Sequence, residues 1–376
     1  MTLLTDDQKM LQETAASFLR DEGGPAKQLR YWRDTGCTDG YGTDFWKRFG
    51  ELGLNGICIP ESHGGLGLGA TEAALVLEEI GRNLTPSPFL TTAVAGVRAI
   101  DGTAHADRWF PQILSGDAVL ALAVDEGKSH RPEATAMAAT RQGNGFLLNG
   151  DKRFVVHGNS ADMILVAART GGSAGESDGI TLFAIEKGAS GLSVDTATVA
   201  DGSKASRLRF DNVAVDSDAV VGDVDGGWAP LSRALGAGRA GAAAELVGVA
   251  AAASDMTVDY LKQRKQFGKL IGEFQALQHR AAHLDGEIEI ARAAALKAAQ
   301  ALDSGDERAE LWVSVAKAKA VASAALAVQE GVQMHGGIGM TDEHDIGLYM
   351  KREAVLSELF GDERYHRARV AALSGY

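Results

Sequence analysis

The segment YLKQRKQFGKLIGEFQALQH, residues 260–279, interrupts a helical pattern in the last third of this 376-residue chain. Its Gly268 is a typical helix stop, because glycine readily adopts the left-handed conformation that ends many helices. Apolar and alanine residues repeat at helical spacing over residues 228–262, 273–302 and 308–334. Long helices joined by short links are typical of bundles, so this part predicts an up-down four-helix bundle.

The middle of the chain has a different periodicity. Residues 118–225 contain short apolar runs separated by Gly, Asn and Asp. This pattern predicts a middle domain of antiparallel β-strands with short turns. Asn149-Gly150 predicts one of the hairpin turns, since both central residues of a type I′ turn need a positive φ.

The N-terminal region, residues 1–117, again has helical spacing. Thr5 and Gln8 have the spacing of a capping box, which satisfies two N–H groups at a helix start. The whole chain is therefore predicted to be an α+β multidomain protein. An N-terminal helical domain is followed by a middle antiparallel β domain over residues 118–225 and by the C-terminal bundle over residues 226–376.

Charge and composition limit the partners. The net charge of -13 argues against a nucleic acid or an anionic membrane surface. No uninterrupted run of 18 apolar residues occurs, and the start MTLLTDDQKM lacks the basic and apolar regions of a signal peptide. We therefore expect a cytoplasmic protein, with Cys37 and Cys58 as reduced core residues and no metal site.

Two segments have residues suited to a phosphate-bearing ligand. In RKQFG, the guanidinium of Arg264 can donate to a diphosphate with two N–H groups, and Phe267 offers a flat apolar face. In QMHGGIGM, residues 333–340, Gly336 and Gly337 allow backbone N–H groups to approach a phosphate. The segments together predict a local anion site in an acidic protein.

With these two segments the chain resembles the acyl-CoA dehydrogenase family of flavoproteins, and weaker similarity extends over nearly the whole sequence. In that family the two segments hold the pyrophosphate and adenosine end of an FAD bound in the neighbouring subunit. The resemblance implies FAD as the cofactor and an acyl-CoA thioester as the substrate. The positions that it assigns to cofactor binding are Arg264, Gln266, Phe267, Gln275, Gln333, Gly336 and Gly337, with Phe154 beside the flavin ring.

The family's catalytic glutamate is missing. In the family this base removes the α-proton of the thioester while a hydride leaves the β-carbon for the flavin. Its usual position corresponds to Phe360, and the position used by isovaleryl-CoA dehydrogenase-like members corresponds to Gly238. The chain thus resembles bacterial members that lack the usual glutamate. The next residue, Arg239, is expected to line the acyl pocket or to contact the CoA.

The part of the family site that surrounds the flavin ring has also changed. The Thr-Glu-Pro and Gly-Ser-Asp motifs correspond to residues 124–132, which read VDEGKSHRP. A Trp-Ile-Thr triplet beside the ring corresponds to Phe154, Val155 and Val156. Phe154 retains a ring that can stack on a flavin, whereas Val156 has no hydroxyl.

This contrast suggests the accessory subunit of a heteromeric acyl-CoA dehydrogenase. Such a subunit would contribute Arg264 and the Gly336-Gly337 loop to an FAD held by a partner that carries the glutamate. The resemblance also implies a homo- or hetero-tetramer and an electron-transferring flavoprotein as the electron acceptor.

Three alternatives stay open. An active homotetramer with a relocated base is one, with Asp362 as the first candidate and Glu358, Glu363 and Glu245 as others. A flavin oxidase or monooxygenase of the same fold is the second. A scaffold with a vestigial pocket is the third.

Overall fold

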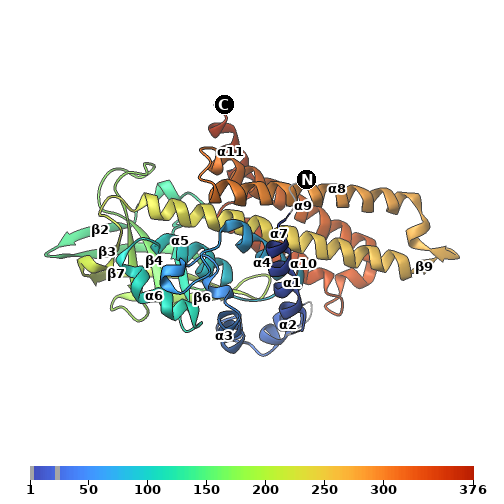
Figure 1. Cartoon of the computed structure of the whole chain (residues 1–376), viewed down its shortest axis with the longest axis horizontal. Coiled ribbons are helices and arrows are strands. Elements are labelled where there is room, and N and C mark those ends of the chain that lie inside the picture. The colour runs from blue at the N-terminus through green and yellow to red at the C-terminus, as the bar shows by residue number, and fades with distance from the viewer. Residues whose placement is uncertain (1–3, 22–25) are drawn as a thin grey trace. The chain divides into compact units, whose positions relative to one another are not determined.

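The computed structural model of the chain (Figure 1) describes residues 4–21 and 26–376. The first three residues of the segment considered for a signal peptide therefore lie outside the described residues. The chain forms two compact units. The helical unit comprises Met1–Tyr31, Ala70–Pro86 and Arg239–Tyr376, and the sheet unit comprises Trp32–Gly69 and Ser87–Gly238.

Helices occur in both units, and the strands of the larger sheet belong to the sheet unit. The helices are α1 (Asp6–Asp21), α2 (Lys27–Asp34), α3 (Thr43–Glu51), α4 (Ala70–Asn83), α5 (Val97–Ile100), α6 (Ala104–Leu114), α7 (Trp228–Gln263), α8 (Gln275–Asp303), α9 (Ala309–His335), α10 (Ile346–Glu358) and α11 (Glu363–Leu373). The strands are β1 (Leu120–Ala123), β2 (Ala138–Gln142), β3 (Gly145–Val156), β4 (Met163–Arg169), β5 (Ile180–Glu186), β6 (Leu192–Thr198), β7 (Lys204–Val215), β8 (Val220–Val221), β9 (Lys265–Gln266) and β10 (Lys269–Leu270).

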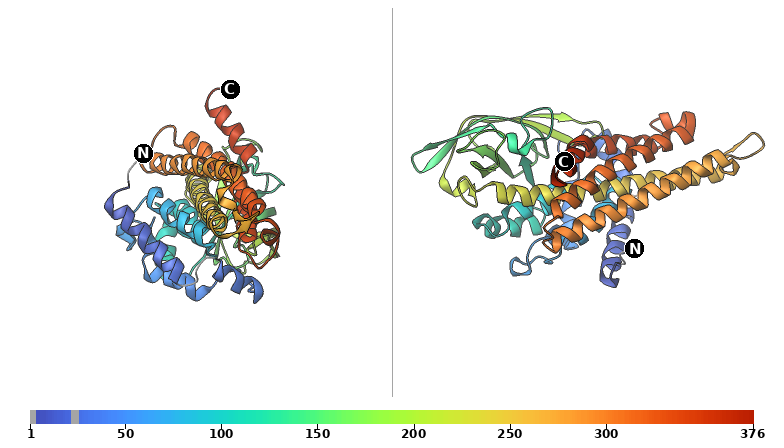
Figure 2. Two further views of the ribbon diagram at one scale, coloured as in Figure 1. Left: turned by 90° about the vertical axis from the view of Figure 1, so that its right-hand side faces the viewer. Right: turned by 90° about the horizontal axis from the view of Figure 1, so that it is seen from above.

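The helical unit confirms the predicted helices. Helices α7, α8 and α9 begin and end within two residues of the predicted bounds. α8 packs along α9, as Figure 2 shows, and α9 also contacts α10 and α11. The capping box is present, since Thr5 N donates to Gln8 Oε1 at 3.0 Å and Gln8 N donates to Thr5 Oγ1 at 3.2 Å. The predicted fold class is thereby confirmed for its helical parts.

Two glycines let α4 and α7 approach each other closely. A Cβ on Gly81 would lie 2.1 Å from the carbonyl oxygen of Glu245, and a Cβ on Gly248 would lie 1.9 Å from that of Glu78. Both distances are far below any van der Waals contact, so no larger residue fits at this crossing without separating the helices. The crossing fixes the part of α7 that carries Arg239.

The sheet unit contains a sheet of eight strands in the order β6-β7-β3-β2-β4-β5-β8, with β1 paired to β4. Most neighbours are antiparallel, as predicted, but β1 runs parallel to β4, with Leu120 opposite Met163. One face of the sheet is covered by buried apolar side chains that alternate along the strands. The middle β domain is therefore confirmed as a mostly antiparallel sheet.

The predicted hairpin turn at Asn149-Gly150 is wrong. Both residues lie inside β3, and the chain turns earlier, around Gly143, where φ is 58°. The pairing of β3 with β7 shifts register between Leu148 and Gly150, which is a β-bulge. Asn149 Oδ1 accepts a hydrogen bond of 2.9 Å from the backbone N–H of Asn212 in β7. The Asn-Gly pair therefore forms a bulge that a partner strand stabilises.

Two helices have the length and composition of a membrane span, although the sequence has no uninterrupted apolar run of that length. These are α7 and the stretch Ala309–Met340. However, 78% of the apolar window in the first and 61% of that in the second are buried inside the protein. Such burial is typical of the core helices of a globular protein. The predicted division of the sequence into three domains stays a prediction.

Candidate functional site

The turn between α10 and α11 carries Phe360, at the position where a catalytic glutamate was sought. Phe360 has a left-handed backbone with φ of 60° and is 7% exposed. Its carbonyl oxygen accepts hydrogen bonds from Arg239 Nε at 3.3 Å and from His366 Nε2 at 3.1 Å. Side chains from α7 and α11 thus fix the backbone at this position, whichever side chain residue 360 carries.

A buried lysine on α9 holds the same turn, and the sequence did not single it out. Lys317 Nζ donates to the carbonyl oxygens of Leu356 at 3.0 Å, Ser357 at 3.1 Å and Gly361 at 3.1 Å. These acceptors use all three ammonium protons, and two of them lie in the last turn of α10, where carbonyl groups lack helical partners. Lys317 is fully buried, and this burial lowers its pKa to about 7. A lysine within an alanine-rich helix is the only sequence signal for it.

The second predicted base position is Gly238 in α7, and Arg239 follows it. Gly238 has no side chain to offer, and Arg239 is 4% exposed. Besides its bond to Phe360, Arg239 donates from Nη2 to the hydroxyl of Tyr365 at 2.9 Å and lies over the Tyr365 ring at 5.4 Å. Its guanidinium is therefore used by the turn, and its contact with a substrate stays a prediction.

Asp362 and Glu363, two candidates for a relocated base, have structural partners. Asp362 is the N-cap of α11, and its Oδ1 accepts from the backbone N–H of Tyr365 at 2.6 Å. Glu363 forms an ion pair of 3.2 Å with Arg367, one turn along the same helix. Capping and i,i+4 pairing are ordinary roles of acidic residues in a first helical turn.

The other two candidates differ in burial. Glu245 is 2% exposed, and its Oε1 accepts from Arg352 Nε at 2.9 Å and from Arg352 Nη2 at 2.5 Å. A buried carboxylate in such a two-bond pair with an arginine is fixed in place. Glu358 is exposed at the end of α10. None of these contacts joins the side chain of Glu245 or Glu358 to the turn that carries Phe360.

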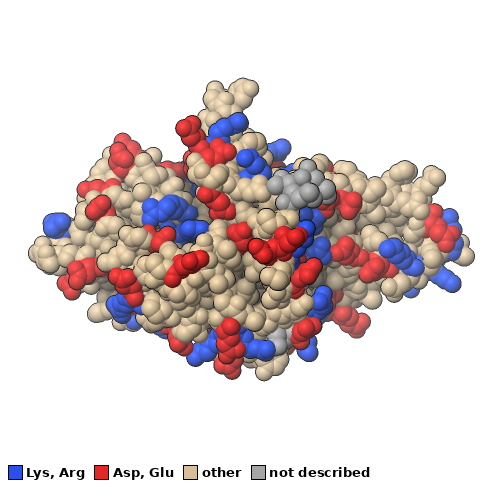
Figure 3. All heavy atoms as spheres, in the orientation of Figure 1, with Lys and Arg blue, Asp and Glu red and all other residues tan. Residues whose placement is uncertain are grey.

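The first predicted cofactor segment forms an exposed hairpin of β9 and β10. Gln266 pairs with Lys269 across it, and Phe267 at its tip is 91% exposed with φ of 53°. Arg264, just before β9, is exposed. Figure 3 shows basic side chains on the face where β9 lies, although the chain as a whole is acidic. The ring of Phe267 and the charged group of Arg264 are therefore accessible at the surface.

The second predicted cofactor segment begins where α9 ends. Gly336 has φ of 64°, which favours glycine, and the short helix Gly336–Met340 follows. A Cβ added to Gly336 or Gly337 would meet no other atom within 4 Å. Gln275 at the start of α8 and Gln333 in the last turn of α9 are both exposed. Packing within the described chain therefore gives no reason for a glycine at position 337.

The predicted ring-stacking residue, Phe154, lies in the sheet unit at an irregular part of β3. Its φ is 52°, and the register of β3 with β7 shifts between Lys152 and Val155. Bulges of this kind change the direction of a side chain, and they are common beside functional sites. Phe154 is half-buried, so part of its ring surface is accessible.

The neighbouring acidic residues are satisfied within the sheet unit. Asp125 Oδ2 lies 2.8 Å from His130 Nδ1, and Asp125 Oδ1 accepts from the backbone N–H of Arg131 at 3.2 Å. Glu126 forms an ion pair of 2.7 Å with the fully buried Lys152 and accepts from two backbone N–H groups. Both carboxylates of the segment at residues 124–132 are thus bonded to groups of the sheet unit.

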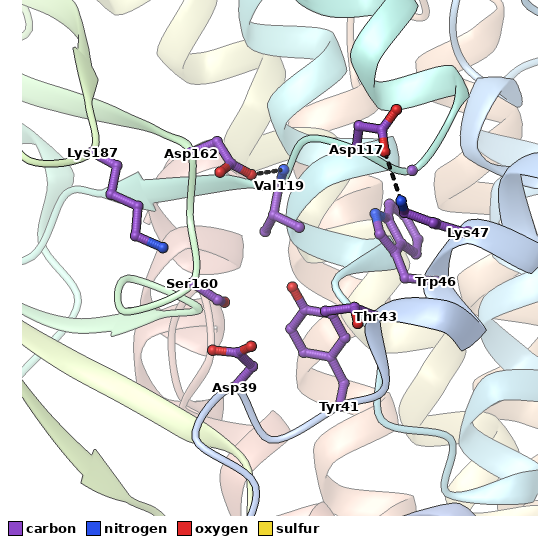
Figure 4. A pocket seen from close by; sticks show the side chains of 11 residues that line it. Asp39, Tyr41, Thr43, Trp46, Lys47, Asp117, Val119, Ser160, Asp162 and Lys187 are labelled. Atoms are coloured by element: carbon purple, nitrogen blue, oxygen red, sulfur yellow. Dashed lines mark hydrogen bonds and ion pairs between the residues drawn. The ribbon is translucent and has the colours of Figure 1, made fainter.

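A polar cavity of about 250 Å³ lies in the sheet unit (Figure 4), and no predicted site residue lines it. Two of its three acidic groups are bonded, since Asp117 pairs with Lys47 at 2.9 Å and Asp162 accepts from the backbone N–H of Val119 at 2.9 Å. Burial raises the pKa of Tyr41, at the inner wall, to about 12. The cavity is therefore separate from the site that the sequence indicated.

The expectations about metals and thiols concern the whole chain. Within residues 4–21 and 26–376, no group of three or more His, Cys, Asp or Glu residues is placed to hold a metal ion. Both cysteines are free, with Cys58 buried and Cys37 half-buried.

Comparison with protein families gives matches over most of the chain. The acyl-CoA dehydrogenase N-terminal domain matches residues 5–117, the middle domain matches residues 121–213, and the C-terminal domain matches residues 225–374. Among characterised proteins, cyclohex-1-ene-1-carbonyl-CoA dehydrogenase of Geobacter metallireducens is 33% identical over 83% of this chain and 84% of its own. Mitochondrial isovaleryl-CoA dehydrogenase of Solanum tuberosum is 32% identical over 95% of this chain and 87% of its own.

Solved structures agree with this architecture. A variant of the Tcur3481–Tcur3483 steroid ACAD is 29% identical with a TM-score of 0.88, covering 98% of both chains. Butyryl-CoA dehydrogenase of Megasphaera elsdenii is 25% identical with a TM-score of 0.89, covering 100% of this chain and 99% of its own.

Proposed function

Because the chain belongs to the acyl-CoA dehydrogenase family, we propose that it is the accessory subunit of a heteromeric FAD-dependent acyl-CoA dehydrogenase. The observation that carries the proposal is the turn at Phe360. Its backbone is held by Arg239, Lys317 and His366, yet a phenylalanine occupies the position of the base. The alternative position is Gly238, which also lacks a carboxylate. A proton cannot be abstracted at either position by this chain.

The nearby carboxylates support the proposal, because three of them are already bonded to other groups of the folded chain. Asp362 caps α11, Glu363 pairs within α11, and Glu245 is buried in an ion pair. A general base needs to come within hydrogen-bond reach of the substrate proton in a suitable protonation state. Moving any of these three side chains to the turn would break a bond that the folded chain uses.

The residues of the helical unit fit the phosphate end of an FAD. Gly337 has no neighbour in its own chain that requires glycine, so a ligand that approaches the backbone closely explains it. The exposed Arg264 can donate bidentately to a diphosphate. FAD, when bound, supplies the acceptor for the hydride that leaves the β-carbon. In this proposal Arg264, Gly336 and Gly337 hold the phosphates, and Gln266, Phe267, Gln275 and Gln333 border them.

The residues of the sheet unit support the other half of the proposal. Asp125 is bonded within its own segment, Glu126 is bonded to Lys152 of β3, and Val156 offers no hydroxyl to a flavin ring. Phe154 retains the ability to stack. A partner chain with intact ring contacts and a glutamate would therefore supply the complete ring site, while this chain contributes the phosphate contacts across the interface.

The partner and the substrate class follow from the family and from one relative. The steroid ACAD structure is named for two chains together, Tcur3481 and Tcur3483. By extension, we infer a hetero-tetramer, an acyl-CoA thioester with a bulky acyl group as substrate, and an electron-transferring flavoprotein as acceptor. A homotetramer with a relocated base is the competing assembly. A cytoplasmic location belongs to the same proposal.

The test is to purify the chain alone and together with a family member that carries the glutamate. We expect the chain alone to be colourless and the complex to carry FAD that an acyl-CoA bleaches, with a native mass above that of either chain. Stoichiometric FAD that acyl-CoA bleaches in the chain alone would overturn the accessory role. Oxygen-dependent turnover without an electron-transferring flavoprotein would indicate an oxidase or monooxygenase of the same fold.

A second variant sharpens the test. Phe360→Glu places a carboxylate on the turn, whose backbone bonds do not depend on the side chain at 360. If the chain works as an accessory subunit, this variant alone remains inactive, because the segment around Asp125 does not complete a ring site. Activity of the isolated variant would indicate that only the base had been lost.

A further inference from the structure

Three aromatic rings in contact, tilted to one another by 32° and 52°, lie beside the two segments that the family assigns to the cofactor. The ring of His335, the last residue of α9, lies 4.6 Å from that of Tyr260 in α7 and 4.3 Å from that of His344, centroid to centroid. The carbonyl oxygen of Tyr260 accepts from the backbone N–H of Arg264 at 2.9 Å. On the other side, His335 directly precedes Gly336. The central ring, which belongs to QMHGGIGM, is therefore in contact with the residue one helical turn before RKQFG.

The bonds of His335 fit only its neutral form. Its Nδ1 lies 2.7 Å from the carbonyl oxygen of Gly331, so Nδ1 carries the proton and donates it. Its Nε2 is buried and has no hydrogen-bond partner among the described residues, while the side chain is 3% exposed. Protonation would place a second N–H on Nε2, without an acceptor and away from water. Burial lowers the pKa of His335, and the nearby His344 lowers it further.

The groups around this ring give a cation no compensation. Tyr260 faces it from α7, and His344 faces it from the segment before α10. The charged residues beside His344 are Glu343 and Asp345, and Asp345 pairs with Arg30 of α2 at 2.6 Å. Arg30 also pairs with Asp342 at 3.4 Å. Among the described residues, neither ring nitrogen of His335 is bonded to a carboxylate.

We propose that His335 is a positioning residue that holds the RKQFG and QMHGGIGM segments together while it is neutral and releases them in mild acid. When the segments separate, the ring reaches water and regains the ordinary histidine pKa of 6.5. The released form then binds protons that the closed form excludes. Below pH 6.5, each further decrease of one pH unit favours release by up to about tenfold, until the pH falls below the pKa of the ring in the closed form.

The inference rests on the proposed function only where it predicts FAD affinity. The complex of this chain with its glutamate-bearing partner is titrated with FAD at about pH 7.5, 6.5 and 5.5. We expect the affinity of the wild type to fall by up to about tenfold over the last unit, and that of His335→Phe to lack this fall. Phenylalanine keeps the stacked ring and removes the titrating nitrogen. His279→Gln, on the exposed face of α8, should behave like the wild type.

Hydrogen exchange separates this inference from the proposed function. Amide exchange in residues 260–270 and 333–344, corrected for its intrinsic pH dependence, is compared between the wild type and His335→Phe. Faster exchange on acidification in the wild type alone supports the inference, even if FAD never binds and the proposed function fails. Parallel pH dependence in the two proteins overturns it, whatever FAD does. Should His335→Phe not fold, His335→Leu takes its place, since it also removes the titration.

Discussion

The two segments assigned to the phosphates and the segment assigned to the flavin ring differ in how their polar groups are used. Arg264 and Phe267 project outward, and Gly336 and Gly337 have open space where a Cβ would lie. The segment at Asp125, in contrast, uses its carboxylate on its own chain. The phosphate segments therefore have exposed groups that can bind a ligand, whereas the carboxylates of the ring segment are already bonded within the chain.

Under the proposed accessory role, a family site divided between two chains accounts for this difference. Groups that serve a neighbouring subunit need to stay exposed, whereas groups that no longer serve the chain's own ring can form internal bonds. An internal bond between buried groups stabilises the fold once the ligand is absent, because an unpaired buried charge is costly. The sheet unit therefore retains its architecture without the family's ring-contacting motifs.

The largest effect is expected from Lys152→Met in the sheet unit. Lys152 is fully buried and pairs with Glu126 at 2.7 Å, so the variant leaves a partly buried carboxylate without its cation. We expect the free energy of unfolding to fall by about 3 kcal/mol, measured by urea denaturation. FAD affinity of the complex should stay unchanged under folding conditions. The exposed neighbour Arg153→Met is the control, and an equal loss there would contradict the role of the pair.

Arg264→Ala probes the other region. Removing a guanidinium that donates to a diphosphate should weaken FAD binding by the complex by roughly 2 kcal/mol, without a change in thermal stability. Flavin fluorescence during titration measures this affinity. Lys265→Ala, the exposed cation at the next position, should have a much smaller effect. If both variants weaken binding equally, the segment contributes only general positive charge.

Stability should depend on pH through Lys317. Its pKa is lowered to about 7 by burial, from the ordinary value of 10.5. Between these values the unfolded chain binds a proton that the folded chain has lost, so the free energy of unfolding rises with pH. This slope is at most about 1.4 kcal/mol per pH unit. It disappears as pH falls below about 7, because the folded chain then binds the proton as well. Urea denaturation of Lys317→Met should lack this slope, whereas Lys319→Met should keep it.

The smallest effect is expected from Asp362→Asn. Asparagine retains the oxygen that accepts from the backbone N–H of Tyr365, so the free energy of unfolding should change by less than about 0.5 kcal/mol. The same change removes any base at this position. Turnover of the complex with an acyl-CoA should therefore stay the same. A large fall in turnover with unchanged stability would restore the relocated-base assembly.

Features that depend on neighbours in sequence could be predicted well. The capping box of Thr5 and Gln8 and the bounds of α7, α8 and α9 follow from local spacing. The Asn149-Gly150 turn was wrong because a distant strand decides it, through the bond from Asn212. The local preference of the Asn-Gly pair for irregular backbone is nevertheless seen, since the pair forms a β-bulge instead of a turn.

The candidate site was predictable to the extent that it lies in sequence motifs. The two phosphate segments are contiguous in sequence, so their residues could be named in advance. The three carbonyl groups held by Lys317 lie 39 to 44 positions further along the chain, and no spacing rule connects them. Likewise, the partner of Glu245, Arg352, becomes visible only when α7 and α10 are packed, whereas the N-cap role of Asp362 is a local feature.

The anchoring of the turn through main-chain oxygens has an evolutionary consequence. Arg239 and His366 donate hydrogen bonds to the carbonyl oxygen of residue 360, and these bonds do not involve its side chain. In the proposed accessory role, exchange of this one side chain removes the reactive group, while the hydrogen bonds that hold the turn are kept. A duplicated gene with such an exchange would encode a non-catalytic companion of its ancestor that still folds.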